Sequence, residues 1–132
     1  MILGVGIDVC AVARMEDSLR RFGDRIWERV LSEPERRALE KRADRAAALA
    51  GRFAAKEAVV KALAGAPGVG WHDLEVQGGS RQPPRMALHG PARALAESMG
   101  VSRVHLSITH DAGVAAAVAI LEGTGPAEGS RP

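Results

Sequence analysis

Three groups of polar side chains in this sequence are of the types that handle phosphates. Asp8 lies at the end of a glycine-containing segment that is expected to form a strand. Glu57 and Lys61 are one helical turn apart in the middle of the chain, and His110 and Asp111 stand in an expected hairpin turn. Two carboxylates, together with waters and substrate phosphates, are how Mg²⁺ is usually held, and lysines suit phosphate oxygens as compact charges. Together the three groups indicate metal-assisted phosphate chemistry.

Each group also has a purely structural interpretation. An aspartate at a strand end is commonly a turn or cap residue, and a histidine in a tight turn is commonly exposed to solvent. Glu57 and Lys61 have the spacing and orientation of a simple helix salt bridge. The sequence contains no P-loop and no GxGxxG pattern, so the glycine-rich segment 65–70 is consistent with a connector. No single group therefore establishes a function.

Lys56 is the most unusual residue of the central segment. At helical spacing, one apolar stripe is formed by Leu49, Phe53, Val60 and Leu63. Lys56 lies in the middle of this stripe, where an unpaired lysine is almost never found. It must therefore meet either a carboxylate of the fold or an anionic ligand, and the sequence leaves both open.

The elements that position these residues are expected to form an α+β fold, with an N-terminal strand, a helical middle and a mostly antiparallel C-terminal half. In the first strand, 2–9, Gly4, Gly6 and Asp8 share one face, which leaves room for a ligand or another backbone. Helices are expected from Arg14 with a break at Gly23, from Ser32 as a cap with Glu35 as the returning acid, and from Asp44 to Gly65. The remaining expectations are short strands at 74–76 and 85–88, a helix at 91–99, and strands at 104–109 and 114–121.

Length and composition indicate one globular domain. The chain has 132 residues, of which 46% are hydrophobic and 26% charged. We expect a single domain at 1–122 and a disordered tail at 123–132, which is rich in glycine and proline. We expect neither a membrane span nor a signal peptide, and the lone Cys10 fits a reducing cytoplasm.

The net charge of +2 is too small to indicate nucleic-acid binding by itself. Between Arg14 and Arg45 the chain carries ten basic and eight acidic residues, and nine of the ten are arginines. Mixed charges of this kind usually form a solvated face, and the alternative is a docking face for an acidic partner. Aromatic residues are only 3% of the chain, which argues against a single-stranded nucleic-acid binder.

Taken together, three motifs resemble those of the holo-acyl-carrier-protein synthases, small members of the 4′-phosphopantetheinyl transferase superfamily. The motifs are Gly4-Val5-Gly6-Ile7-Asp8 followed by Arg14, then the segment from Arg52 to Ala62 with Lys56-Glu57 and Lys61, and finally Ser107-Ile108-Thr109-His110. The similarity covers residues 1 to about 122 in the family's motif order. It implies the 4′-phosphopantetheinyl transferase fold.

The resemblance also implies a reaction. Enzymes of this kind transfer the 4′-phosphopantetheine group of coenzyme A to a serine of an apo acyl carrier protein and release adenosine 3′,5′-bisphosphate. It implies Asp8 and Glu57 as Mg²⁺ ligands and Lys61 at the reacting phosphates. It implies that His110 either contacts the coenzyme A phosphates or takes part in proton transfer. Asp111 is expected either to orient that imidazole or to act through a metal-bound water.

The remaining implications concern Arg52, Lys56 and the partners. Arg52 is expected to reach the nucleotide phosphates, whereas the role of Lys56 stays open and includes pairing with a core carboxylate. Acyl carrier proteins are acidic, and similar enzymes dock them on the first helix. The docking candidates here are Arg14, Arg20, Arg21, Phe22 and Arg25.

Similar proteins are homotrimers with active sites between subunits, act in fatty acid biosynthesis, and bind neither nucleic acid nor membranes. The family usually continues Phe-Gly-Thr-Gly after the central helix, whereas this chain has Leu63-Ala64-Gly65-Ala66-Pro67-Gly68. The loop keeps its glycines but lacks the threonine, so the resemblance does not extend to a nucleotide contact at this loop. The alternative function is a non-catalytic module that binds coenzyme A or a carrier protein.

Overall fold

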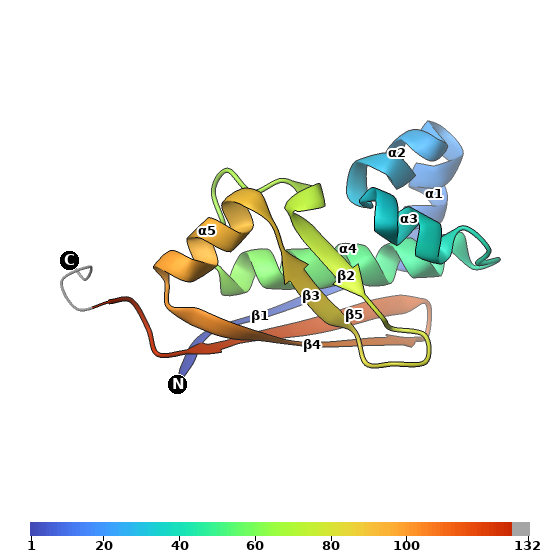
Figure 1. The fold of residues 1–132 in the computed structure, drawn as a ribbon. Coiled ribbons are helices and arrows are strands. Elements are labelled where there is room, and N and C mark those ends of the chain that lie inside the picture. The colour runs from blue at the N-terminus through green and yellow to red at the C-terminus, as the bar shows by residue number, and fades with distance from the viewer. Residues whose placement is uncertain (128–132) are drawn as a thin grey trace.

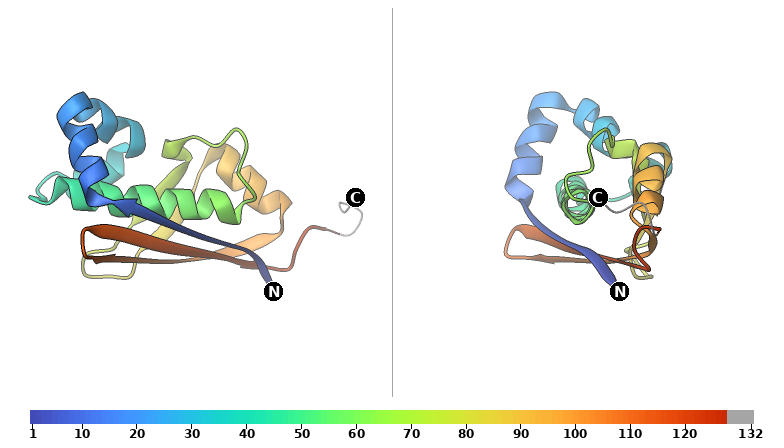
Figure 2. Two further views of the ribbon diagram at one scale, coloured as in Figure 1. Left: turned by 180° about the vertical axis from the view of Figure 1, so that it is seen from behind. Right: turned by 90° about the vertical axis from the view of Figure 1, so that its left-hand side faces the viewer.

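The computed structural model describes residues 1–127, and the chain folds around one long central helix (Figure 1). This helix, α4, spans Arg45–Ala62. A three-stranded antiparallel sheet covers one side of it, in the order β1 (Ile2–Ala11), β5 (Val114–Gly123), β4 (Val101–Asp111). The end-on view in Figure 2 shows α4 enclosed by the sheet, the N-terminal helices and the C-terminal half.

Three short helices follow β1 at one end of α4. They are α1 (Val12–Phe22), α2 (Asp24–Val30) and α3 (Glu33–Leu39). The expected break at Gly23 is present, with a positive φ of 58° that glycine adopts without strain. The helix after Ser32 is present as expected and ends at Leu39.

Elements of the C-terminal half also pack around α4. A 3₁₀ turn, η1 (Trp71–Asp73), leads into a two-stranded antiparallel sheet of β2 (Leu74–Gln77) and β3 (Arg85–Leu88). Helix α5 (Gly90–Ser98) then leads to β4. The predicted strands and helices are all present, so the α+β prediction is confirmed.

Several local predictions differ from the structure. His110 and Asp111 were expected in the hairpin turn, but they are the last two residues of β4, and the turn consists of the two residues that follow. Asp44 occupies the N-cap position of α4, but its carboxylate accepts two 2.7 Å hydrogen bonds from Arg42 instead of capping the helix. Strand β5 extends through Glu122 to Gly123, because Glu122 pairs with Ile2 on β1 and Gly123 pairs with Val101 on β4. The expected disordered tail includes residues 128–132, which lie outside the described residues.

The core is built from small side chains on α4. Six alanines of this helix are buried, along with Leu49 and Val59. These small side chains let the helix lie close to the sheet. Within residues 1–127, no helix combines the length and apolar content needed to cross a membrane.

Candidate active site

The site begins where β1 lies against α4. A Cβ at Gly4 would stand 2.2 Å from the carbonyl oxygen of Ala62, and one at Gly6 would stand 1.8 Å from that of Ala58. Real side chains cannot occupy these positions, so the glycines admit the helix backbone. Of the two expectations for this face, another backbone is the one that the structure shows, and it carries Asp8 to the helix.

Lys61 connects the two elements. Its Nζ donates hydrogen bonds to Asp8 Oδ1 at 3.1 Å and to the carbonyl oxygen of Ile7 at 3.0 Å. Within residues 1–127, the ion pair of Lys61 is therefore with Asp8, and not with Glu57 as the simple helix salt bridge would require. The lysine is half exposed, so its ammonium group can exchange this partner for an anionic ligand.

Glu57 lies one turn before Lys61 and faces a cavity. The cavity has a volume of about 220 Å³ and is lined by Glu57, Val60 and Trp71, with further walls from Gly65, Ala66, Val69, Gly70 and Leu74. Its lining combines apolar side chains with polar atoms, which include the Glu57 carboxylate and the backbone of the glycine-rich loop that follows α4. A concave site with apolar walls and a few convergent polar groups is typical of small-molecule binding.

Two carboxylates make this a candidate magnesium site. Among residues 1–127, no group of three or more His, Cys, Asp or Glu side chains could hold a metal by itself. Mg²⁺ commonly takes only one or two carboxylates and completes its octahedron with waters and substrate phosphates. Asp8 and Glu57 fit this donor set, and a phosphate-bearing substrate would supply the rest.

Lys56 is fully buried and is paired inside the protein. Its Nζ lies 2.6 Å from Glu35 Oε1, and both side chains have no exposed surface. It also donates to the carbonyl oxygens of Val30 at 2.6 Å and Trp71 at 3.0 Å. Burial lowers the pKa of Lys56, and the nearby Glu35 carboxylate acts in the opposite direction. Of the two possibilities left by the sequence, the carboxylate of the fold is the partner.

His110 lies against the other end of α4. Its Nε2 is 3.0 Å from the carbonyl oxygen of Ala47, which can only accept, so Nε2 carries the hydrogen and Nδ1 is the acceptor of the neutral ring. A Cβ on Gly51 would stand 2.9 Å from the same Nε2. The tight turn after His110 and the exposed Asp111 consists of Ala112 and Gly113, both with positive φ.

His110 and Asp8 are not brought together within one chain. Strand β5 lies between them, with Ala117 opposite Asp8 and Ala115 opposite His110. Two strand spacings separate their backbones by about 10 Å. Both residues project toward the α4 side of the sheet, but they contact different turns of that helix.

Arg52 does not lie at the surface. Only 6% of it is exposed, and one guanidinium nitrogen donates to the carbonyl oxygen of Gly78 at 3.1 Å. Burial lowers the pKa of Arg52. The guanidinium also packs against Gly79, at the start of the turn between β2 and β3. The guanidinium is therefore held by the hairpin between β2 and β3 in the single chain.

The docking candidates lie on an exposed face of α1 and α2. Arg20 and Arg21 both contact Asp17, at 3.1 and 3.9 Å, and remain largely exposed. Phe22 is 48% exposed and, with Arg25, lines a shallow hollow of about 210 Å³ that also includes Ile26 and Arg29. The face thus combines arginines with an apolar side chain.

Arg14 links this face to the cavity. Its guanidinium lies 5.0 Å from the centre of the Phe53 ring, a cation–π distance, and Phe53 lies 5.2 Å from Trp71. Phe53 is one turn before Glu57 on α4. A partner that contacts Arg14 is therefore close to the cavity beside Glu57.

Sequence reasoning missed Gly51 and Trp71. A glycine inside a helix costs about 1 kcal/mol relative to alanine. Gly51 in the middle of the predicted helix could therefore have indicated that another group lies close to the helix backbone there. Trp71 had no such signal, because its contacts with Phe53 and the cavity depend on how η1 folds back over α4.

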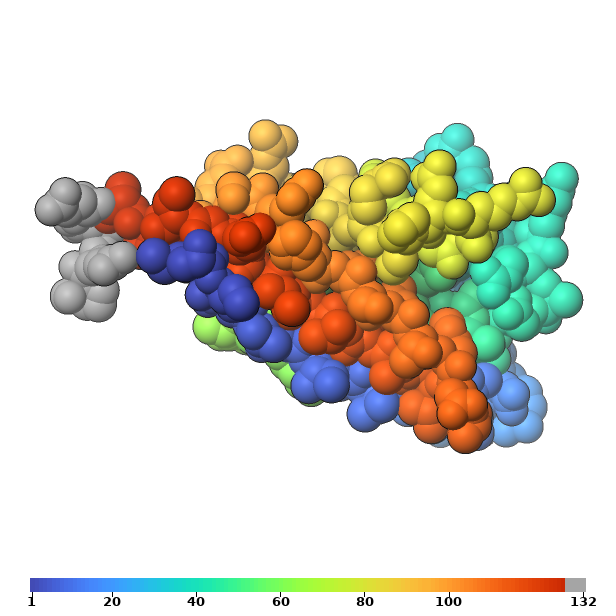
Figure 3. Space-filling model, turned by 90° about the horizontal axis from the view of Figure 1, so that it is seen from below, coloured from blue at the N-terminus to red at the C-terminus, as the bar shows by residue number. Residues whose placement is uncertain are grey.

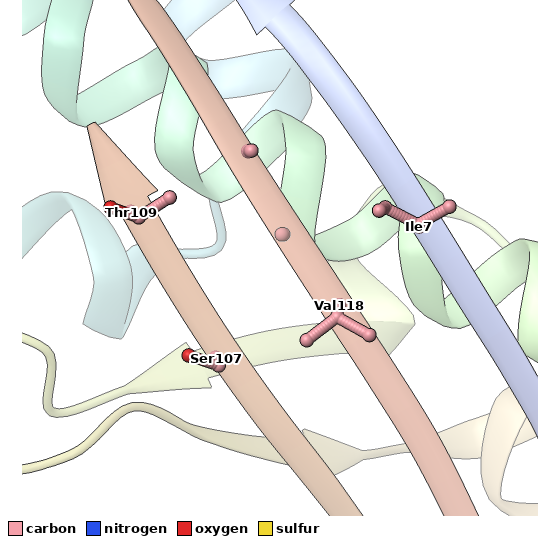
Figure 4. A pocket seen from close by; sticks show the side chains of 6 residues that line it. Ile7, Ser107, Thr109 and Val118 are labelled. Atoms are coloured by element: carbon pink, nitrogen blue, oxygen red, sulfur yellow. The ribbon is translucent and has the colours of Figure 1, made fainter. Parts of the chain in front are cut away.

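A second surface is the outer face of the sheet, which no helix covers (Figure 3). It carries the apolar side of β1: Val5, Ile7 and Val9 are 59%, 66% and 63% exposed. Rows of side chains cross the three strands here, and Figure 4 shows Ile7, Val118 and Ser107 in one of them. Next to this row, the small Ala116 contributes to a shallow hollow of about 190 Å³.

Comparison with known proteins identifies the family. The model of the 4′-phosphopantetheinyl transferase superfamily matches residues 4–119. A holo-acyl-carrier-protein synthase from Anaeromyxobacter sp. (strain K) is 52% identical over 129 residues, which cover 96% of this chain and all of the relative. The chain belongs to the 4′-phosphopantetheinyl transferase superfamily.

Solved structures agree with this assignment. The holo-ACP synthase of Plasmodium yoelii superposes with a TM-score of 0.83 at 28% identity, covering 94% of this chain and 97% of that one. The Helicobacter pylori holo-acyl-carrier-protein synthase, solved in complex with coenzyme A, gives 0.76 at 30% identity, with 89% and 99% covered. The predicted resemblance to the holo-acyl-carrier-protein synthases, the phosphopantetheinyl transferase fold and the enzyme class are confirmed.

Proposed function

We propose that Asp8, Glu57 and Lys61 form the centre at which this enzyme transfers the 4′-phosphopantetheine group of coenzyme A to a serine of an apo acyl carrier protein. The observation that carries the proposal is the contact of Lys61 with Asp8 across the β1–α4 junction, one turn from Glu57 and its cavity. The junction brings together two carboxylates and a cation from segments far apart in the sequence.

The chemistry requires charge control at a pyrophosphate. The serine oxygen of the carrier forms a bond to the β-phosphorus, the bond to the bridging oxygen breaks, and adenosine 3′,5′-bisphosphate leaves. Mg²⁺ held by Asp8 and Glu57 would offset the negative charge of the pyrophosphate. Lys61 exchanges Asp8 for a phosphate oxygen and stabilises the charge that develops during transfer. The cavity beside Glu57, which is lined by both apolar and polar atoms, suits the pantetheine arm, because this arm is uncharged and contains both alkyl and amide groups.

The acidic carrier protein docks on the face formed by Arg14, Arg20, Arg21, Phe22 and Arg25. The arginines supply attraction over distance, and Phe22 with its hollow supplies an apolar contact. The stacking of Arg14 on Phe53 places this face next to the cavity, so a carrier serine can approach the site.

The same proposal includes a homotrimer in which sites lie between subunits. The uncovered apolar face of β1 supports association, because large exposed apolar surfaces are typical of interfaces. The separation of His110 from Asp8 supports a shared site, in which the His110 of one copy acts beside the Asp8 of another. There the free Nδ1 can accept the serine proton or, when it is protonated, donate a hydrogen bond to a coenzyme A phosphate. A cytoplasmic location and a role in fatty acid biosynthesis belong to this proposal as well.

The test is the transfer rate of Asp8→Asn and Glu57→Gln with coenzyme A and Mg²⁺. Each variant keeps the shape of the side chain and removes one metal-binding charge, so kcat/KM should fall about 100-fold or more. Glu40→Gln removes an exposed carboxylate at the end of α3 and serves as the matched control. Circular dichroism should show an intact fold in all three. Full activity in both site variants would refute the metal assignment.

A further inference from the structure

In the buried pair of Lys56 and Glu35, all three ammonium hydrogens and both carboxylate oxygens form hydrogen bonds inside the protein. The three hydrogens of the ammonium group meet Glu35, the Val30 carbonyl and the Trp71 carbonyl. Glu35 Oε1 also accepts the backbone N–H of Ser32 at 2.9 Å, and Oε2 accepts that of Val76 at 3.1 Å. The pair therefore fixes four backbone groups, two at the connection between α2 and α3 and two in the segment from Trp71 to Val76.

Two of these groups bracket the segment from Trp71 to Val76. Lys56 holds the carbonyl oxygen at its beginning, and Glu35 holds the N–H near its end. The segment leads from η1 into a sheet of only two strands, β2 and β3. A two-stranded sheet is marginally stable alone, so its position depends on contacts such as these.

This segment forms one wall of the cavity beside Glu57. Trp71 lines the cavity directly, as does Leu74, and the Trp71 ring packs on Phe53. The glycine-rich loop that forms the rest of the wall ends at Gly70, immediately before Trp71. A shift of the Trp71 carbonyl would therefore move the wall that faces Glu57.

A buried ion pair is seldom the most stable way to fill a core, because the cost of removing two charges from water offsets their attraction. Apolar side chains of similar size can replace such pairs with little loss of stability. Apolar side chains cannot, however, replace the hydrogen bonds that orient the four backbone groups. The geometric effect of the pair is thus separable from its effect on stability.

We propose that the Lys56–Glu35 pair is a positioning pair for coenzyme A, since it holds the Trp71–Val76 segment and thereby sets the shape of the cavity beside Glu57. This inference rests on the proposed function, because it assumes that coenzyme A occupies that cavity. Neither residue contacts the substrate, because both are fully buried.

The experiment compares the double variant Glu35→Gln/Lys56→Met with Leu39→Ala. The double variant removes both charges together and keeps the side-chain lengths. Leu39 is buried in the same helix as Glu35, so Leu39→Ala loosens α3 but leaves the pair intact. Coenzyme A binding is measured by calorimetry with Mg²⁺, alongside KM and kcat, below the melting temperature of each protein.

We expect the Kd and KM for coenzyme A to rise about tenfold or more in the double variant, because small displacements of a binding wall cost this much. In Leu39→Ala both should stay within about twofold of the parent, as expected for a change away from the site. If the double variant does not fold, Glu35→Asp is measured instead; it keeps the charge, shortens the reach to Val76, and should raise Kd about threefold.

Unchanged coenzyme A binding in the folded variant would overturn the inference, as would an equal loss in Leu39→Ala. Both results leave the proposed function standing. If the parent protein does not bind coenzyme A at all, this result would instead refute the assignment of coenzyme A to the cavity, and with it the proposed function. The calorimetric measurement separates these outcomes, because it does not depend on turnover.

Discussion

Lys61 on α4 reaches across to β1 and donates a hydrogen bond to Asp8 Oδ1 at 3.1 Å. The two residues are far apart in sequence and meet because Gly4 and Gly6 let the strand lie directly on the helix backbone. The contact brings a cation to a carboxylate that is also a candidate metal ligand. Under the proposed function, a phosphate would offer the ammonium group a second anionic partner, and Asp8 would then be free to act as a metal ligand.

Lys61→Met tests this exchange. The methionine keeps most of the side-chain volume but removes the charge that would meet the reacting phosphates. We expect kcat to fall about 100-fold, the size typical for loss of one group that stabilises transition-state charge. Lys41→Met, at an exposed lysine between α3 and α4, is the matched control and should retain parental kcat. A Lys61→Met enzyme with parental kcat would contradict the role of Lys61.

Gly51→Ala tests the placement of His110. A Cβ at position 51 would stand 2.9 Å from His110 Nε2, so the imidazole must move and its hydrogen bond to the Ala47 carbonyl should be lost. We expect a lower kcat than in the parent, measured in the same transfer assay. In a His110→Ala background the clash is absent, and Gly51→Ala should raise the free energy of unfolding by about 0.5–1 kcal/mol through helix propensity. If Gly51→Ala has the same effect on stability with and without His110, the contact is not tight.

Ile7→Lys tests the outer face of the sheet. The side chain is 66% exposed in the single chain, and a lysine there costs little unless a second copy covers it. Light scattering should give about 42 kDa for the parent, three times the chain mass of 13.9 kDa, and a lower mass for the variant. Phe22→Lys also replaces an exposed apolar side chain with lysine, but on α1, and it should leave the assembly intact. A parent that is monomeric at assay concentrations would contradict the homotrimer.

Arg21→Glu tests the docking face. Charge reversal on α1 should raise the KM for an acidic carrier about tenfold with little change in kcat, because rim charges act mainly on encounter. Added salt should reduce the difference between variant and parent, since it screens exposed charges. Arg37→Glu reverses a similarly exposed arginine on α3 and controls for net charge. An equal rise in KM for both variants would show that total charge matters rather than this face.

The sequence predicted the elements of the fold and one of its hidden requirements. The alternation of β1 identified a glycine face, and the apolar stripe of α4 showed that Lys56 needed an anionic partner. The partner could not be identified, because Glu35 is 21 residues away and meets Lys56 only after α2 and α3 pack on α4. The same carboxylate was expected as the returning acid of the Ser32 cap, and it does accept the Ser32 N–H.

The rest depended on tertiary contacts that periodicity does not encode. Alternation in β1 gives two faces but does not say which one meets the helix, and the apolar face of Val5 and Ile7 turned out to be the uncovered one. Arg52 was expected near phosphates on the basis of its motif. Its burial follows from the β2–β3 hairpin folding over α4, which no local pattern near Arg52 indicates.

The most direct test of the central claim is intact-protein mass spectrometry of an apo acyl carrier protein incubated with this protein, coenzyme A and Mg²⁺. A parallel reaction contains a chelator, and a third contains the Asp8→Asn variant. We predict that the carrier gains the mass of one phosphopantetheine group, and that both the chelator and the variant abolish the gain. No gain with several unrelated carriers, in spite of measured coenzyme A binding, would contradict the account. That result would support a non-catalytic binding module and direct attention to the altered loop at 65–70.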